Sequence, residues 1–336
     1  MPNPTVPRWR AERPWLDDTV VCDGLLPWTS MFLPLGADLA EQLRRFHANG
    51  VDHISLTAAA GTDDCVEAMR RLGSFHRELG AHEQWITIVR TGDDIRRAKS
   101  HGRLSISFHF QSATPFAADL DLVDAFHGAG VRRAILAYNE ANVFADGCHE
   151  PRNAGLSALG RRLVERMDKV GMVVDMSHCG ERTSLDVMEM PLRHPAIFSH
   201  SNARAIFEHE RNITDDQIRC CAQRGGYIGI NGVGFFLGAA GPAIPAAVAR
   251  HAAHVAAIAG ADRVGLGLDF MFLEGSDYLF YEQARGRWPR GYPEPPWSFL
   301  QPEQFGDLVT ALENEGFSQE QMKGLLGDNY LRLAHR

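Results

Sequence analysis

The chain has few cysteines, and none of them is arranged in a recognisable framework. Its six cysteines show no Cys-x-x-Cys spacing, and the adjacent Cys220 and Cys221 suit neither a disulfide scaffold nor a zinc ribbon. Long apolar runs are also missing, because no segment approaches the ~20 apolar residues of a membrane span and residues 1–10 lack the core of a signal peptide. We therefore expect a cytoplasmic protein with reduced thiols and no membrane partner.

An excess of basic charge is missing as well. Lysine and arginine number 34 against 42 aspartate and glutamate, which gives a formal net charge of -8 and a pI near 6.0. This balance disfavours nucleic acid as a partner. No GxGxxG or P-loop turn follows an early strand-like run, which disfavours a doubly wound nucleotide-binding sheet. The expected partner is a small-molecule substrate.

What the chain does have is eight strand-like runs separated by segments of helical periodicity. Eight such units predict a single α/β domain over residues 1–336, a (β/α)₈ TIM-type barrel over about residues 19–333 that follows an N-terminal extension, residues 1–18. A further run, residues 85–90, is either a ninth edge strand or the true third barrel strand. The eight runs are residues 19–25, 51–57, 104–111, 132–138, 172–178, 196–200, 226–231 and 264–269.

Three of these runs end in residues that can bind a metal. His178, His200 and Asp269 close the fifth, sixth and eighth runs, where the carboxyl ends of barrel strands present catalytic groups. Imidazole and carboxylate are ligands of open catalytic zinc sites, and Asp269 can also carry a proton. The alternative is that the histidines are merely hydrogen-bonded at strand ends. After Asp269, residues 275–301 lack periodicity and are interpreted either as a loop covering a pocket or as a solvated connection.

Five short motifs stand out along the chain: Val174-Asp175-Met176-Ser177-His178, Ile197-Phe198-Ser199-His200-Ser201-Asn202-Ala203, Arg211-Asn212-Ile213, Gly267-Leu268-Asp269-Phe270 and Ala154-Gly155-Leu156-Ser157. They resemble, in matching order over residues 23–333, motifs of the membrane (renal) dipeptidases of the amidohydrolase superfamily. The resemblance implies a metallo-dependent hydrolase barrel, two zinc ions sharing a bridging carboxylate, hydrolysis of dipeptides and a homodimer.

The resemblance also implies roles for individual residues. His178 and His200 match the histidines of the second metal, and Asp269 matches the aspartate that manages the proton of the bridging water. Arg211 matches the arginine that meets the substrate carboxylate, a role that suits the guanidinium fork. Asn202, beside His200, either orients substrate or caps a following helix.

The sequence departs from the family pattern at three places. The His-x-Asp pair of the first metal is missing from Cys22-Asp23-Gly24-Leu25-Leu26-Pro27-Trp28, Gln111 stands for the bridging glutamate, and Tyr138 stands for the histidine that polarises the scissile carbonyl. The first two changes remove about two negative charges, which disfavours two adjacent dications. We expect one divalent metal, zinc first among the candidates, held by His178, His200 and Asp269 with Gln111, while the Tyr138 hydroxyl donates to the oxyanion.

Other polar residues are further candidates for this site. The loop Asp146-Gly147-Cys148-His149-Glu150 either supplies replacement ligands or, as we favour, forms a turn. Asp23 either reaches the site or belongs to an Asp-Gly turn. His109 shares a strand face with Gln111, and Cys179 is interpreted as a buried thiol rather than a nucleophile.

The sequence therefore predicts a dipeptidase-like metallohydrolase of small dipeptides or related carboxylated amides, with a mononuclear site. Two alternatives remain open. One is a non-hydrolytic enzyme acting on an amino-acid-derived metabolite, because fold does not fix chemistry. The other is an inactive homologue that binds a small molecule, which the missing His-x-Asp pair favours.

Overall fold

Strands and helices alternate along the chain in the computed structural model, which describes residues 6–28, 38–273, 278, 279, 281, 292–333 and 335. The strands are β1 (Cys22–Leu26), β2 (His53–Ala60), β3 (Ile86–Ile88), β4 (Leu104–Gln111), β5 (Val131–Ile135), β6 (Val173–Asp175), β7 (Ile228–Ile230) and β8 (Val264–Leu266). The α-helices described are α1 (Arg8–Ala11), α2 (Leu39–Ala48), α3 (Cys65–Gly80), α4 (Gly92–Ser100), α5 (Leu122–Gly128), α6 (Ala158–Val170), α7 (Glu181–Glu189), α8 (Asp215–Gln223), α9 (Gly234–Leu237), α10 (Ile244–Ala259), α12 (Phe305–Asn314), α13 (Gln319–Lys323) and α14 (Asn329–Leu333).

The strands form a curled parallel sheet that follows a barrel course. The order β1-β2-β4-β5-β6 is regularly paired, and β7 pairs with β8. Single parallel bridges, Asp175 to Ile197 and Phe198 to Ile228, link β6 to β7 through the predicted run at residues 196–200. The Asp269 amide donates to the Leu25 carbonyl at 3.0 Å, which brings the segment after β8 back to β1. The predicted α/β barrel is confirmed, with regular pairing concentrated on one side.

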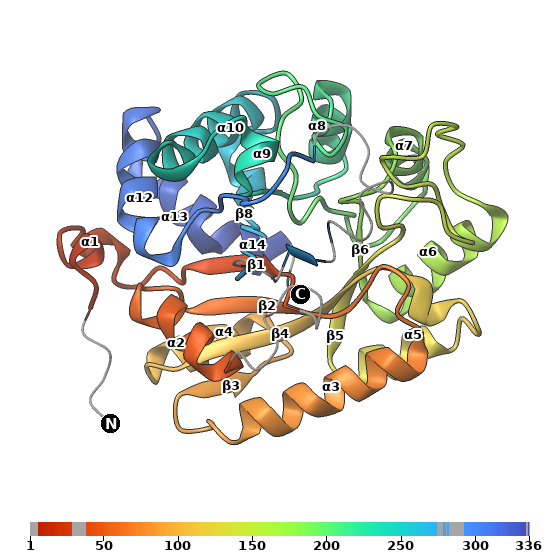
Figure 1. Ribbon diagram of the computed structural model, residues 1–336, viewed down its shortest axis with the longest axis horizontal. Helices are drawn as coiled ribbons and strands as arrows, with labels where there is room; N and C mark the ends of the chain where they lie inside the picture. The colour runs from red at the N-terminus through yellow and green to blue at the C-terminus, as the bar shows by residue number, and fades with distance from the viewer. Residues whose placement is uncertain are drawn as a thin grey trace.

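The ambiguous run at residues 85–90 lies outside the circle of eight. Its strand β3 pairs with the first half of β4, at Leu104–Ile106, whereas β5 pairs with the second half from Phe108 onward. Figure 1 shows β1, β2, β4 and β5 side by side at the centre of the molecule, with α3 along one side and α10 and α12 on the opposite side. The third barrel strand is therefore β4.

Local sequence signals account for several helix ends. Reciprocal capping boxes begin α3 (Asp64 with Glu67), α4 (Thr91 with Asp94) and α8 (Thr214 with Gln217). Helix α6 stops at Gly171, whose φ of 84° lies in the left-handed region. Near the end of the chain, α12 begins at Phe305 and a π-helical turn, Gly324–Asp328, joins α13 to α14.

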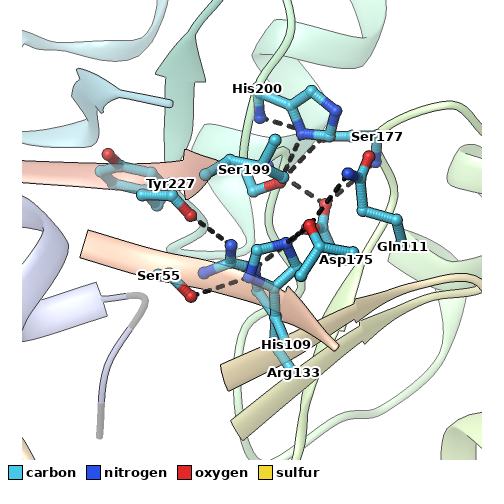
Figure 2. A network of polar contacts seen from close by, with 12 residues as sticks. Ser55, His109, Gln111, Arg133, Asp175, Ser177, Ser199, His200 and Tyr227 are labelled. Atoms are coloured by element: carbon cyan, nitrogen blue, oxygen red, sulfur yellow. Dashed lines mark hydrogen bonds and ion pairs between the residues drawn. The ribbon is translucent and has the colours of Figure 1, made fainter. Parts of the chain in front are cut away.

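The interior of the barrel is strongly polar. Arg133 on β5 is 2% exposed and donates from Nε to Asp175 Oδ2 at 3.2 Å. Asp175 Oδ1 accepts from the backbone amides of Ser177 and Ser199 at 3.0 and 3.1 Å. Figure 2 shows this network below His200, with His109 and Gln111 from β4 beside it. The ion pair thus fixes the two segments that lead to His178 and His200.

None of the helices in the described part of the chain is long and apolar enough to span a membrane.

Candidate functional site

The two histidines meet at the barrel rim as predicted. His178 follows β6 and is 4% exposed, while His200 follows the bridge segment at residues 197–198 and is fully buried. Their Nε2 atoms lie 2.9 Å apart. Burial first, and the charge of Arg211 second, lower the pKa of both imidazoles, so both are neutral near pH 7.

The hydrogen bonds around the pair assign its tautomers. Asn139 Oδ1 lies 2.7 Å from His178 Nδ1, and Asn139 Nδ2 donates to the Tyr292 hydroxyl, so Nδ1 of His178 carries the proton. His178 Nε2 is then an acceptor, and His200 Nε2 is its donor. His200 Nδ1 accepts from the Ser199 hydroxyl at 2.7 Å. A continuous chain of hydrogen bonds therefore runs from Ser199 to Asn139.

Asp269 stands across from the histidines and is held by Asn231. Its carboxylate accepts from Asn231 Nδ2 at 2.9 Å, and it lines a small cavity of about 20 Å³ together with His178 and Tyr138. Burial raises the pKa of Asp269 to about 7, against the opposing effects of Arg211 and of the Asn231 hydrogen bond. A carboxyl group with that pKa can exchange a proton at neutral pH.

Backbone strain gathers at the same place. His178 (φ 65°), Asp269 (φ 56°) and Asn139 (φ 62°) are three of the four described non-glycine residues with a positive φ. Each such conformation costs roughly 1–3 kcal/mol and persists where surrounding structure imposes it, often at functional sites. The strained backbone at both His178 and Asp269 supports the assignment of this rim as the functional site.

Tyr138 stacks on His178, with ring centroids 4.1 Å apart. Burial, reinforced by the charge of Asp269, raises the pKa of Tyr138, so its hydroxyl keeps its proton. The phenol can therefore act as a hydrogen-bond donor in the small cavity.

Arg211 is a buried cation without a carboxylate partner among the described residues. It is 3% exposed, donates to the His200 carbonyl at 2.9 Å and lies over the Phe236 ring, while its Nε has no hydrogen-bond partner. It lines a polar cavity of about 220 Å³ that also reaches His178. A buried guanidinium without an anion is costly, and a bound carboxylate would offset that cost.

Asn202 has a different position from the one expected. Its Oδ1 accepts from the backbone amide of Asn231 at 3.0 Å, and its side chain is fully buried. In the described residues it neither caps a helix nor lines the cavities around His178. Asn202 therefore supports Asn231, the residue that holds Asp269.

The remaining candidates have structural partners. Gln111 donates from Nε2 to Thr57 Oγ1 at 3.0 Å, and His109 contacts Ser55 and Thr57 through its two ring nitrogens. Asp23 lies within β1, not in a turn, and its Oδ1 accepts from the Leu268 amide at 2.8 Å.

Asp146 and Cys179 are the last two candidates. Asp146 binds Arg152 and the Ala154 amide, while Cys148, His149 and Glu150 of the same loop line the polar cavity that contains Arg211. Burial raises the pKa of the Cys179 thiol to about 12, so it is not a nucleophile. Of the predicted covering loop, residues 274–277, 280 and 282–291 lie outside the described residues, and Tyr292 and Trp297 line the small cavity.

These donors can be tested against the two-metal centre that the family resemblance implies. They do not fit it: the segment that lacks the His-x-Asp pair carries the buried, apolar Leu25 and Leu26, and Gln111 is bonded to Thr57. Within the described residues, no three His, Cys, Asp or Glu side chains form a group that could hold a metal. Of the four predicted ligands, Asp269 is bonded to Asn231 and Gln111 to Thr57, which leaves His178 and His200. Both of their Nδ1 atoms contact oxygens, and the Ser199 hydroxyl can accept as well as donate, so the two Nε2 atoms could face one cation.

Asn139, Ser199 and Asn231 complete the site and were not predicted. Asn231 ends the seventh strand-like run, so the strand-end position that identified His178 would also have found it. Asn139 follows Tyr138 directly, and its reach to His178 depends on Gly147, where a Cβ would lie 2.2 Å from the Asn139 carbonyl carbon.

The sequence is similar to those of known dipeptidases. The model of the membrane dipeptidase family (Peptidase family M19) matches residues 57–279. An uncharacterized dipeptidase of Schizosaccharomyces pombe is 29% identical over 248 residues, 72% of this chain and 55% of its own length. Dipeptidase tcpJ of Claviceps purpurea is 27% identical over 289 residues, 85% of this chain and 61% of its own. The chain thus spans little more than half the length of these curated relatives.

Solved structures match over nearly the whole chain. An amidohydrolase from Pseudomonas aeruginosa superposes with a TM-score of 0.84 at 25% identity, covering 95% of this chain and 97% of that one. A metallo peptidase from Rhodobacter sphaeroides, liganded with a phosphinate mimic of the dipeptide L-Ala-D-Ala, gives a TM-score of 0.73 at 21% identity, covering 94% and 98%. The second likeness bears on the fold alone.

Proposed function

Because this chain belongs to the membrane dipeptidase family, we propose that it is a dipeptidase-type hydrolase of small dipeptides or related amides that carry a carboxylate. One observation carries the proposal: Asp269, His178 and Tyr138 line a single small cavity. A proton acceptor, an imidazole and a hydrogen-bond donor around one cavity are the groups that amide hydrolysis requires.

The chain's own residues account for the proton and charge movements. The Asp269 carboxylate accepts a proton from the attacking water, and Asn231 holds it in place through a 2.9 Å hydrogen bond. The Tyr138 hydroxyl donates to the oxyanion of the tetrahedral intermediate. Asp269 then returns the proton to the leaving amine, and Arg211 binds the substrate carboxylate from the adjoining polar cavity.

One divalent metal, with zinc the first candidate, would be held by His178 and His200. When bound, it would supply Lewis acidity to the water and the scissile carbonyl. Each histidine is oriented by an oxygen on its other ring nitrogen, Asn139 Oδ1 for His178 and Ser199 Oγ for His200, which is the usual outer shell of a metal-binding imidazole.

The test is a hydrolysis screen on the purified chain, with and without added zinc, using dipeptides of both stereochemistries and N-acyl amino acids. We expect the chain to hydrolyse amides that carry a carboxylate. The control compounds have a primary carboxamide in place of that carboxylate, and we expect no turnover of them. Asp269→Asn should lower turnover by about 10²–10⁴-fold. Absence of turnover on every carboxylated amide, with zinc present, would contradict the proposal.

A small-molecule binding protein without turnover is the second candidate. The observation that favours it is the Nε2 to Nε2 hydrogen bond at 2.9 Å, which satisfies both histidines in the absence of a metal. Binding of a carboxylated ligand by a metal-free chain that hydrolyses none of the screened amides would select this function.

A further inference from the structure

Three hollows adjoin one another along the rim of the barrel. The polar cavity of about 220 Å³ contains Arg211 and shares His178 with the small cavity of about 20 Å³. The small cavity in turn shares Phe235, Tyr292 and Trp297 with a third hollow of about 500 Å³. The cavity at Asp269 therefore borders the polar cavity of Arg211 at His178, and it borders this third hollow at the three aromatic side chains.

The third hollow, which we term the aromatic compartment, is walled by rings. Phe235 lies 5.1 Å from Trp297 and 5.3 Å from Tyr292 between ring centroids, and Phe207 lines the same space. Prolines and small residues make up most of the remaining wall, and Glu208 is its one carboxylate among the described residues. Such a surface binds apolar groups through area burial and ring stacking.

The aromatic compartment is too large to be filled by a small side chain. Its volume of about 500 Å³ lies in the range of ligand pockets, whereas the cavity at Asp269 has room for the reacting atoms alone. Ala239 and Ala240 give part of the wall small side chains, and Gly238 lets the Phe207 ring pack closely, since a Cβ there would lie 2.5 Å from that ring. A group that fills it must be bulky.

We propose that the substrate is an amide with a bulky apolar acyl group, aromatic or long aliphatic, and a carboxylate on its amine side. The acyl group occupies the aromatic compartment and the carboxylate meets Arg211. Hydrolysis breaks the C–N bond: water supplies the hydroxyl of the released acid and the hydrogen of the released amine. This inference rests on the proposed hydrolase function and specifies its substrate class.

The test measures binding rather than turnover. In the Asp269→Asn background, the affinities of N-phenylacetylglycine and N-acetylglycine are measured by calorimetry. We expect the phenylacetyl compound to bind at least about tenfold more tightly, because burying a phenyl group contributes more than the ~1.4 kcal/mol that a tenfold change needs. Equal affinities, or binding of neither compound, would overturn the inference.

Filling the compartment should remove that preference. Ala239→Phe is expected to bring the two affinities within about threefold of each other, whereas Ala253→Phe, at a similarly half-buried alanine on α10 outside this compartment, should leave the preference intact. Phe207→Leu is a milder change to the wall and should lower the affinity for N-phenylacetylglycine without changing that for N-acetylglycine. It serves as the test variant if Ala239→Phe does not fold. A preference that survives both wall variants would contradict the assignment.

The two levels of the proposal fail separately. Tight binding of phenylacetylglycine with no turnover by the wild-type chain would support the aromatic compartment and count against the hydrolase. Turnover of dipeptides and N-acyl amino acids with no preference for a bulky acyl group would support the hydrolase and count against the aromatic compartment.

Discussion

His178 and His200 present the same ring atom to each other, Nε2 to Nε2 at 2.9 Å. Two lone pairs cannot lie at this distance without a proton or a cation between them. The Asn139 and Ser199 hydrogen bonds allow either, because the Ser199 hydroxyl can reverse its role. The pair can therefore hold either a proton or one cation between its two Nε2 atoms.

Asp269 should set the pH dependence of turnover. Its pKa is raised to about 7 by burial, and the base is active only when deprotonated. We expect kcat/KM to rise about tenfold per pH unit below 7 and to level off above it. Asp269→Asn should lower kcat by about 10²–10⁴. The control is Asp23→Asn, since the pKa of Asp23 is also raised to about 7 but this carboxyl lies inside the barrel. A lost inflection in the Asp23 variant would refute the assignment.

Arg211→Lys should weaken carboxylate binding by about 10–100-fold, since hydrogen bonds to charged groups contribute about 1.5–3 kcal/mol. Lysine lacks the planar fork, so the loss should fall on KM for a carboxylated amide and spare the matching primary amide. Arg204→Lys is the matched control, because Arg204 lines the same polar cavity but its side chain is 28% exposed. Equal losses in the two variants would show that Arg211 has no special role.

The strand-end pattern made much of this predictable. Buried, mainly apolar runs mark seven barrel strands and the bridged segment at residues 196–200, and their polar ends identified His178, His200 and Asp269. The polar interior could not be predicted, because Arg132 and Arg133 are adjacent and only the strand register decides which one points inward. The left-handed backbone at His178 and Asp269 is likewise imposed by tertiary contacts. The contact of Asn202 with Asn231 could not be predicted, because the Asn231 amide is distant in sequence.

Asp23 should make the protein less stable as pH rises. Its pKa is about 7 in the folded chain, mainly because of burial, and near 3.8 when unfolded. The folded state therefore binds more protons between these values, and the free energy of unfolding falls as pH rises from about 4 to 7, by about 4 kcal/mol for this group. Asp269 acts in the same direction. Urea unfolding of Asp23→Asn should show a smaller fall in the free energy of unfolding between pH 4 and 7 than wild type shows. The same fall in both proteins would contradict this prediction.

Arg133→Met should destabilise the fold, because it leaves the fully buried Asp175 without its cation. The expected loss is about 3–5 kcal/mol in the free energy of unfolding. Adding Asp175→Asn should restore part of it, since an amide oxygen can still accept from the Ser199 backbone. Arg8→Met, which removes an ion pair whose arginine side chain is 92% exposed, should change stability by no more than about 0.5 kcal/mol. A comparable loss in both single variants would refute the argument.

The most direct measurement is the zinc content per chain by elemental analysis, after exposure to zinc and gel filtration. It compares wild type, the His178→Ala, His200→Ala double variant, and His101→Ala, which changes an exposed histidine. We predict about one zinc in wild type and in His101→Ala, and none in the double variant. A metal-free wild type, or zinc retained by the double variant, would contradict the account.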